Sequence, residues 1–284
     1  MASLRDLRRR IKSVQNTRKI TKAMELVAAA RMRRAQERVV AARPYADEIR
    51  NVMVDLMKRT PEYEHPYLQV REVKKRVVIL ITTDRGLVGA LNSNSIRLLL
   101  REMNTSSIPI AVVTIGRKGR DVMVRLRKEL VADITGLGDR PQMGDILPAV
   151  RVALDAYEQG DVDQVDMVYS HFISVGRQQA TLQRLIPVEP PEDAERLAAD
   201  FEYEPEAQDV LDALLPRYVE GQVYRAVLEN GASEQAARMI AARNASDNAG
   251  DLIEDYTLAA NKLRQSTITT ELIEVVSGAS ALEG

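Results

Sequence analysis

The chain has 284 residues, of which 45% are hydrophobic, so it can bury at least one sizeable core, and its length allows one or two domains. The formal net charge of -1, with 29% charged residues, gives no overall bias toward nucleic acid, membranes or acidic substrates. The chain contains no cysteine, which excludes disulfides, thiolate metal sites and thiol redox switches.

Residues 1–60 predict one long helix that packs against another helix. Apolar residues in it recur at the seam spacing of a coiled coil, with one shift in the pattern. They are Leu4, Leu7, Ile11 and Val14 before the shift, and Ile20, Met24 and Val27 after it. A helix over residues 3–58 would span roughly 85 Å, more than most domains are wide, so it has to protrude or pass through something.

The start of this helix is strongly basic. Residues 1–38 hold twelve Lys or Arg against Asp6, Glu25 and Glu37. Such a segment can contact nucleic-acid phosphates, form a solvated coiled coil or match an acidic protein partner. No aromatic residue occurs in residues 1–44, which argues against stacking on single strands, and the charges surround the apolar seam. A protein partner is therefore the favoured interpretation, and the other two stay open.

After a linker at 61–75, residues 76–188 predict a central domain in which strands alternate with helices. Strand patterns cover 76–83, 108–116, 165–174 and 179–188, a short apolar segment covers 130–134, and helix patterns cover 93–103, 118–129 and 143–158. This alternation predicts a mostly parallel sheet that is covered by helices on both faces.

The remainder of the chain is an acidic connection at 189–205 and a second long helix at 206–284. One stripe of this helix is apolar. Its members are Val219, Val223, Ala226 or Val227, Leu252, Tyr256, Ala259, Leu263, Ile268, Leu272 and Val275. Pro216 and Gly250 are expected to kink or weaken the helix.

The segment TTDRGLVGALN, residues 82–92, follows the first central strand, where doubly wound folds bind a nucleotide phosphate. Gly86 and Gly89 give GxxG rather than GxGxxG, and Leu87 and Val88 stand where bare backbone would have to face the phosphate. A structural turn is the favoured interpretation, with a nucleotide site as the alternative.

No catalytic residue, metal site or cofactor site is predicted. His65 and His171 are the only histidines, and neither has a carboxylate cluster at ligand spacing nearby. The serines lack the GxSxG pattern of a nucleophile elbow.

Three long segments carry a resemblance to a known family. They are IKSVQNTRKITKAMELVAAARM (11–32), TDRGLVGALN (83–92), and ASEQAARMIAARNASDNAGDLI (232–253) followed by NKLRQSTITTELIEVVSGA (261–279). The chain resembles the gamma subunits, or central stalks, of F-type ATP synthases. The resemblance implies a long antiparallel coiled coil of the N- and C-terminal helices plus a central Rossmann-like α/β domain.

The same resemblance implies a non-catalytic rotor inside a ring of alpha and beta subunits, which couples transmembrane flow of protons or sodium ions to ATP synthesis or hydrolysis. The implied partners also include the epsilon subunit and the membrane c-subunit ring, without nucleic acid, cofactor or a membrane span of its own. The implied location is peripheral, on the cytoplasmic face of a bacterial inner membrane.

By resemblance, Arg238, Gln265 and Thr269 contact the beta subunit, and Met24 lies beside that contact on the other helix. We therefore expect antiparallel pairing to bring Met24 near the turn from Gln265 to Thr269. The segment from Ser266 onward has no basic residue and is expected to sit in a nonpolar sleeve of the ring.

Overall fold

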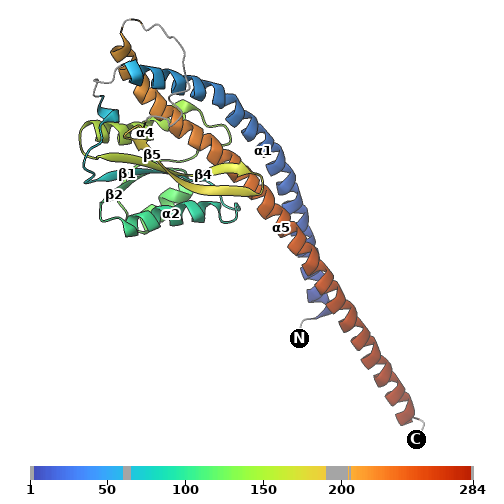
Figure 1. Ribbon diagram of the computed structural model, residues 1–284. Helices are drawn as coiled ribbons and strands as arrows, with labels where there is room; N and C mark the ends of the chain where they lie inside the picture. The colour runs from blue at the N-terminus through green and yellow to red at the C-terminus, as the bar shows by residue number, and fades with distance from the viewer. Residues whose placement is uncertain (1–2, 60–64, 190–203, 205, 283–284) are drawn as a thin grey trace. The chain divides into compact units, whose positions relative to one another are not determined.

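The computed structural model describes residues 3–59, 65–189, 204 and 206–282 (Figure 1). The chain forms two compact units, one made of residues 1–28 and 239–284 and the other of residues 29–238. The two long helices each contribute to both units, and the sheet lies wholly in the second. Most of the predicted acidic connection lies outside the described residues.

Helix α1 runs from Leu4 to Arg59 and begins with a capping box. The Asp6 amide donates to Ser3 Oγ at 3.2 Å, and the Ser3 amide donates to an Asp6 carboxylate oxygen at 3.3 Å. These two bonds satisfy amides that have no partner inside the helix, which fixes where it starts.

Helix α5 is continuous from Ala207 to Leu282, so neither Pro216 nor Gly250 ends it. Leu215 and Val219, on either side of the proline, are fully buried. Gly250 faces the guanidinium of Arg18 on α1, 3.5–3.8 Å from where a β-carbon would stand. Packing against α1 and the sheet therefore outweighs the low helix propensity of both residues.

Within residues 29–238, α1 and α5 pack antiparallel. Two core clusters contain residues from both helices. Residues later in α1 pack with residues earlier in α5, as antiparallel pairing requires. Ala35 and Val39 cluster with Leu228 and Ala232, whereas Met53 and Leu56 cluster with Leu211 and Leu215. The antiparallel pairing expected from the sequence is confirmed.

Within residues 1–28, the buried stripe of α1 differs from the predicted seam. Leu7 and Ala28 are buried, but Ile20 and Val27 are 62% and 51% exposed. The spacing continues from Val14 without the expected shift, so the half-buried Thr21 joins the stripe, and of the three residues predicted after the shift only Met24 is half-buried. A polar Arg18 and Thr21 hid this continuation in the sequence.

A similar displacement occurs on α5. Leu252 and Ala259 are exposed, whereas the buried residues of its second half are small. They are Ala242, Ser246, Ala249 and Ala260. Small side chains at these positions permit a close approach of a neighbouring helix.

The central sheet has the order β3-β2-β1-β4-β5. Its strands are β1 (Arg76–Ile81), β2 (Ile110–Ile115), β3 (Leu130–Ile134), β4 (Gln164–Ser174) and β5 (Arg177–Ile186). Strands β3, β2, β1 and β4 pair in parallel with one another in that order, and β5 pairs antiparallel with β4. The predicted mostly parallel sheet is confirmed.

Helices cover both faces of this sheet, as Figure 1 shows for α2 and α4. They are α2 (Leu91–Thr105), α3 (Arg117–Arg125) and α4 (Met143–Glu158), and a short 3-10 helix, η1, spans Pro66–Leu68. Alternate residues of β1 enter different cores: Ile79 packs with the α4 side and Leu80 with Leu99 and Met123 on the other. A strand buried on both faces has to be apolar throughout, which explains RVVILI.

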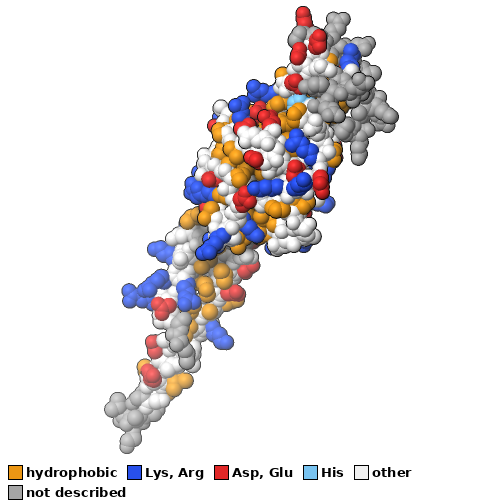
Figure 2. All heavy atoms as spheres, turned by 90° about the vertical axis from the view of Figure 1, so that its left-hand side faces the viewer, with side chains coloured by type: hydrophobic (Ala, Val, Ile, Leu, Met, Phe, Trp, Pro, Cys, Tyr) orange, Lys and Arg blue, Asp and Glu red, His pale blue; other side chains and the backbone are white. Residues whose placement is uncertain are grey.

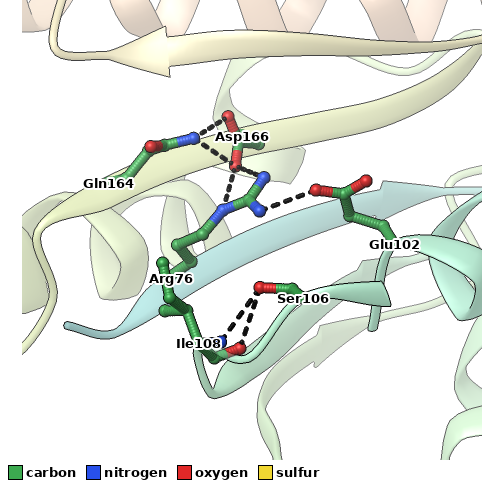
Figure 3. A network of polar contacts seen from close by, with 6 residues as sticks. All are labelled: Arg76, Glu102, Ser106, Ile108, Gln164 and Asp166. Atoms are coloured by element: carbon green, nitrogen blue, oxygen red, sulfur yellow. Dashed lines mark hydrogen bonds and ion pairs between the residues drawn. The ribbon is translucent and has the colours of Figure 1, made fainter. Parts of the chain in front are cut away.

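One buried ion pair ties the amino ends of β1 and β4 to α2 (Figure 3). Arg76 donates to Asp166 through Nε and Nη2, at 3.0 and 2.6 Å, and to Glu102 through Nη1 at 2.7 Å. Gln164 donates to both oxygens of Asp166. Because every charged group in this network is hydrogen-bonded within it, the network serves the fold.

Candidate functional site

The outer surface of α1 carries large apolar side chains that do not pack on α5. Ile20, Leu26 and Val27 are 62%, 63% and 51% exposed. Exposed apolar groups on a helix that already has a helical partner mark a surface for another protein. Sequence reasoning missed this surface because it assigned Ile20 and Val27 to the seam, and unshifted spacing from Val14 would have found it.

The last part of α5 has the same character. No residue from Arg264 to Ser277 is buried, and five large apolar side chains are exposed there. They are Ile268, Leu272, Ile273, Val275 and Val276. We call this segment, 264–277, the exposed end of α5. Its apolar residues meet no partner within the described chain.

Gln265 and Thr269 lie one helical turn apart on this exposed end, so their side chains share a face. The Thr269 hydroxyl donates to the carbonyl oxygen of Gln265 at 2.9 Å. The Gln265 amide is exposed and is available for a directional bond to another chain. The predicted pair is therefore brought together.

Arg238 is not a free surface charge. Its Nη2 lies 2.5 Å from Glu234 Oε1, and both side chains are mostly buried. Burial raises the pKa of the Glu234 carboxyl, and the charge of Arg238 opposes that rise. Arg238 therefore neutralises a carboxylate of its own helix, which leaves part of its guanidinium for an outside acceptor.

Met24 is half-buried on α1, but its expected position near Gln265 and Thr269 is wrong. Arg18 lies against Gly250, and antiparallel pairing from there brings Met24 opposite about residue 244. Gln265 then lies about 30 Å further along α5, at 1.5 Å per residue. The sequence showed that the helices pair but contained no contact from which to set their register.

The basic residues do not form one continuous surface. On the face that Figure 2 shows, Lys and Arg side chains are mixed with acidic and apolar ones. Some are paired locally: Lys22 Nζ lies 2.9 Å from Glu25, and Arg31 lies 2.8 Å from Asp139. Dispersed, partly paired charges fit a protein partner better than a phosphate backbone.

The segment 82–92 forms a turn whose polar groups are hydrogen-bonded within the protein. Asp84 accepts the amides of Arg117 and Gly136, each at 2.9 Å, and so joins the ends of three strands. Asn92 accepts the Thr83 amide and donates to the Thr83 hydroxyl. The Arg117 amide, at the amino end of α3, is therefore bonded to a carboxylate of the protein itself.

Both histidines have structural partners. His65 accepts the Tyr67 amide at 3.0 Å through Nδ1, and His171 lies against Glu229. Burial lowers the pKa of His65, which favours its neutral form. Within the described residues, no three histidine or carboxylate side chains are grouped so that they could hold a metal ion.

Across the described part of the chain, no helix combines enough length with enough apolar character to cross a membrane. The exposed apolar residues of α5 are interspersed with Glu271 and Glu274.

Solved structures with the same architecture are ATP synthase stalks. The central stalk and c-ring structure of the Tetrahymena thermophila mitochondrial ATP synthase contains a chain that is 27% identical, with a TM-score of 0.62 over 80% of this chain and 99% of that one. The rotor of the Euglena gracilis mitochondrial ATP synthase, 20% identical, has a TM-score of 0.68 over 93% of this chain and 98% of its own, which is evidence of fold alone.

Sequence relatives are closer. The ATP synthase gamma chain of Acidithiobacillus ferrooxidans (strain ATCC 53993 / BNL-5-31) is 49% identical over 288 residues, covering 99% of this chain and all of the relative. That of Herpetosiphon aurantiacus is 48% identical, covering 99% of both chains. A family model described as ATP synthase matches residues 3–282. The chain therefore belongs to the ATP synthase gamma-chain family.

Proposed function

We propose that the chain is the rotor shaft of an F-type ATP synthase. It couples ion flow across the membrane to ATP synthesis or hydrolysis by turning inside the ring of alpha and beta subunits. The observation that carries this proposal is the exposed end of α5, where five large apolar side chains extend beyond Ala260, the last buried residue among those described, in a chain of this family.

The surface chemistry suits a shaft that meets three similar partners in turn. Exposed ion pairs contribute roughly 0 to 1 kcal/mol each, so they bias orientation together but exchange readily. Lys22 with Glu25 and Arg31 with Asp139 are pairs of this kind. A deep apolar docking site would instead hold the shaft at one partner.

The chain itself makes and breaks no bond in this proposal; catalysis belongs to the beta subunits. Its partners are the alpha and beta subunits, the c-subunit ring and the epsilon subunit, and it is peripheral to the inner membrane on the cytoplasmic side. The match to a stalk solved together with a c-ring supports the c-subunit ring as a partner.

Within the shaft, Gln265 and Thr269 are proposed to form directional bonds to the beta subunit, because both are exposed on one face. Arg238 is proposed to bind a carboxylate or carbonyl of that subunit while it neutralises Glu234. Met24 contacts the beta subunit separately, at a different height on the shaft. These roles rest on family resemblance and exposure.

Reconstitution tests the proposal. Purified alpha and beta subunits are mixed with and without this chain, and the assemblies are sized by native mass spectrometry. We expect one copy per ring of three alpha and three beta subunits, and ATP hydrolysis that turns a bead fixed to the central domain. Rings that exclude the chain, or hydrolysis without rotation, would contradict it.

A further inference from the structure

A cavity of about 200 Å³ lies in the central unit at the carboxyl ends of β1 and β2. Thr82, Thr83 and Gly116 line it from the sheet. Residues 137–141, after β3, line a second side, and α1 and α5 close the others. Ligands of doubly wound sheets bind at this edge, and the two long helices form further walls of a partly open cavity.

The cavity has an excess of positive charge that the protein does not neutralise. Four arginines line it, three of them on one face of α1. Arg31 is paired with Asp139. Arg34, Arg38 and Arg140 have no carboxylate partner among the described residues, and Arg34 and Arg38 bond only to carbonyl oxygens.

The acidic residues of the lining are already engaged. Asp84 accepts two backbone amides, and Glu234 is paired with Arg238. Asp139 is paired with Arg31. The three guanidinium groups of Arg34, Arg38 and Arg140 therefore line the cavity without a carboxylate partner from the protein, which is the arrangement that an anion requires.

A separate observation concerns a buried acceptor in the lining of the cavity. Gln235 lines it and is only 6% exposed, yet its Oε1 accepts no hydrogen bond from any described residue. A buried acceptor without a partner costs about 1–3 kcal/mol, so such groups are rare in folded chains. A ligand hydroxyl or amine would supply the missing bond.

Part of this space exists because of one glycine. Gly231, on α5, lines the cavity, and a β-carbon built there meets nothing within 4 Å. Glycine in the interior of a helix is unfavourable relative to alanine, so its presence needs a reason outside the helix. Keeping the cavity open is such a reason.

We propose that this cavity binds a small phosphate ester that carries hydroxyl groups, the chemistry of a sugar phosphate. Three unpaired guanidinium groups match a phosphate dianion better than a single carboxylate, and their planar forks fit phosphate oxygens. Gln235 accepts a hydroxyl of the same molecule. The ligand would bridge the sheet and both long helices.

The size of the cavity excludes a dinucleotide. Sites for drug-sized ligands occupy about 300–1,000 Å³, and this cavity is smaller. The site therefore differs from the nucleotide site that the segment 82–92 had suggested, although it lies at the same edge of the sheet.

Calorimetric titration of the purified full chain in phosphate-free buffer tests the proposal with three probes: ribose 5-phosphate, inorganic phosphate and neutral ribose. We expect saturable binding of ribose 5-phosphate at one site, at least about tenfold tighter than inorganic phosphate because one buried acceptor gains its partner. Ribose alone should not bind measurably.

Two glycine variants locate the site. Gly231→Leu fills the cavity and should abolish binding, whereas Gly221→Leu is the matched control. Gly221 also lies in α5 with open space at its β-carbon, but it does not line the cavity. Both should keep or raise the melting temperature, because each removes a helical glycine.

Side-chain variants test the assigned chemistry. Arg38→Gln should weaken ribose 5-phosphate at least about tenfold, and Gln235→Leu should reduce its affinity to that of inorganic phosphate. Arg97→Gln, on the exposed surface of α2, should change neither the affinity for ribose 5-phosphate nor that for inorganic phosphate. Absence of saturable binding, or binding that survives Gly231→Leu, would overturn the site. Equal affinity for phosphate and ribose 5-phosphate would overturn the role of Gln235.

Discussion

Single residues at the end of β2 decide how closely neighbouring strands and turns can approach. Gly116 has a φ of +106°, and a β-carbon there would lie 2.2 Å from the Thr82 carbonyl oxygen. The Gly119 amide donates to the Thr82 hydroxyl at 2.9 Å, which holds α3 against β1. Glycine is required at position 116 by both the backbone angle and the space.

Gly116→Ala should therefore destabilise the chain by at least about 2 kcal/mol. Urea unfolding followed by circular dichroism measures the change. Gly86→Ala is the control, because a β-carbon at Gly86 meets nothing within 4 Å and its φ is not positive. A similar, small effect of both substitutions would show that the turn adjusts freely.

The pair of Glu234 and Arg238 makes a prediction about pH. Burial raises the folded-state pKa of Glu234 above its ordinary value of 4.5, and Arg238 limits that rise. A carboxyl group whose pKa is higher in the folded state than in the unfolded state adds to the free energy of unfolding. This contribution is fully present at pH values below the unfolded-state pKa and is lost as the pH rises through the folded-state pKa. Removing Arg238 should deepen that loss.

We expect Arg238→Gln to cost about 1–2 kcal/mol more at pH 8 than at pH 4, because only the ionised Glu234 needs its partner. Urea unfolding at the two pH values measures this. The double variant Glu234→Gln/Arg238→Gln should lose the difference. An equal cost at both pH values would mean that Arg238 acts through packing alone.

At the scale of elements, most of the fold was predictable because its hydrophobic patterns are unambiguous. The helix at 143–158 was predicted to the residue, and β1 and β2 differ from their predicted spans only at the ends. The seam of α1 was not predictable in this way, because Arg18 and Thr21 interrupt its apolar spacing. Ile20 and Val27 suggest a different seam, but both are exposed.

One candidate site could be predicted from the sequence and the other could not. Gln265 and Thr269 could be predicted to lie together because one helix separates them by a single turn. The cavity could not, because its lining comes from five stretches of chain that only the tertiary fold unites. Its one sequence signal was the position of Thr82 and Thr83 after a buried parallel strand.

The register of α1 against α5 gives a crosslinking prediction. The chain has no cysteine, so a cysteine at Met24 and single cysteines at 239–248 can be paired without background. With a short bismaleimide, we expect crosslinks at positions spaced three or four residues apart, strongest near residue 244.

Cysteines at 262–273 serve as the control series for Met24. They should remain unlinked, because the contact between Arg18 and Gly250 puts them too far along α5. Crosslinks at 262–273, with none at 239–248, would require a different register. Mass spectrometry of the tryptic peptides identifies each linked pair.

For the whole molecule, α1 and α5 are the elements that belong to both compact units. Any torque that passes between the units along the chain therefore passes through these two helices. Arg238 is the last residue of one unit on α5, and the exposed end of α5 belongs to the other. This distribution suggests separate roles for apolar and directional contacts.

The last prediction compares these two roles in the assembled complex. Deletion of residues 277–284 removes only the tip of the apolar end. Apolar contacts have no preferred direction, so this tip can keep the shaft centred but does not fix its rotational angle. Appreciable ATP-driven rotation should remain. The triple substitution of Arg238, Gln265 and Thr269 by Ala removes directional bonds and should loosen the coupling between hydrolysis and ion uptake.

Membrane vesicles that contain each variant are assayed for ATP hydrolysis and ion uptake side by side. The matched control replaces Arg97, Thr105 and Gln179 by Ala, since these are the same three residue types on exposed positions of the central domain. The control should leave the ratio of ion uptake to hydrolysis unchanged, and the triple substitution in α5 should lower it. If the deletion uncouples the complex while the α5 triple does not, torque is carried by the tip of the shaft, because loss of directional bonds would then have left coupling intact.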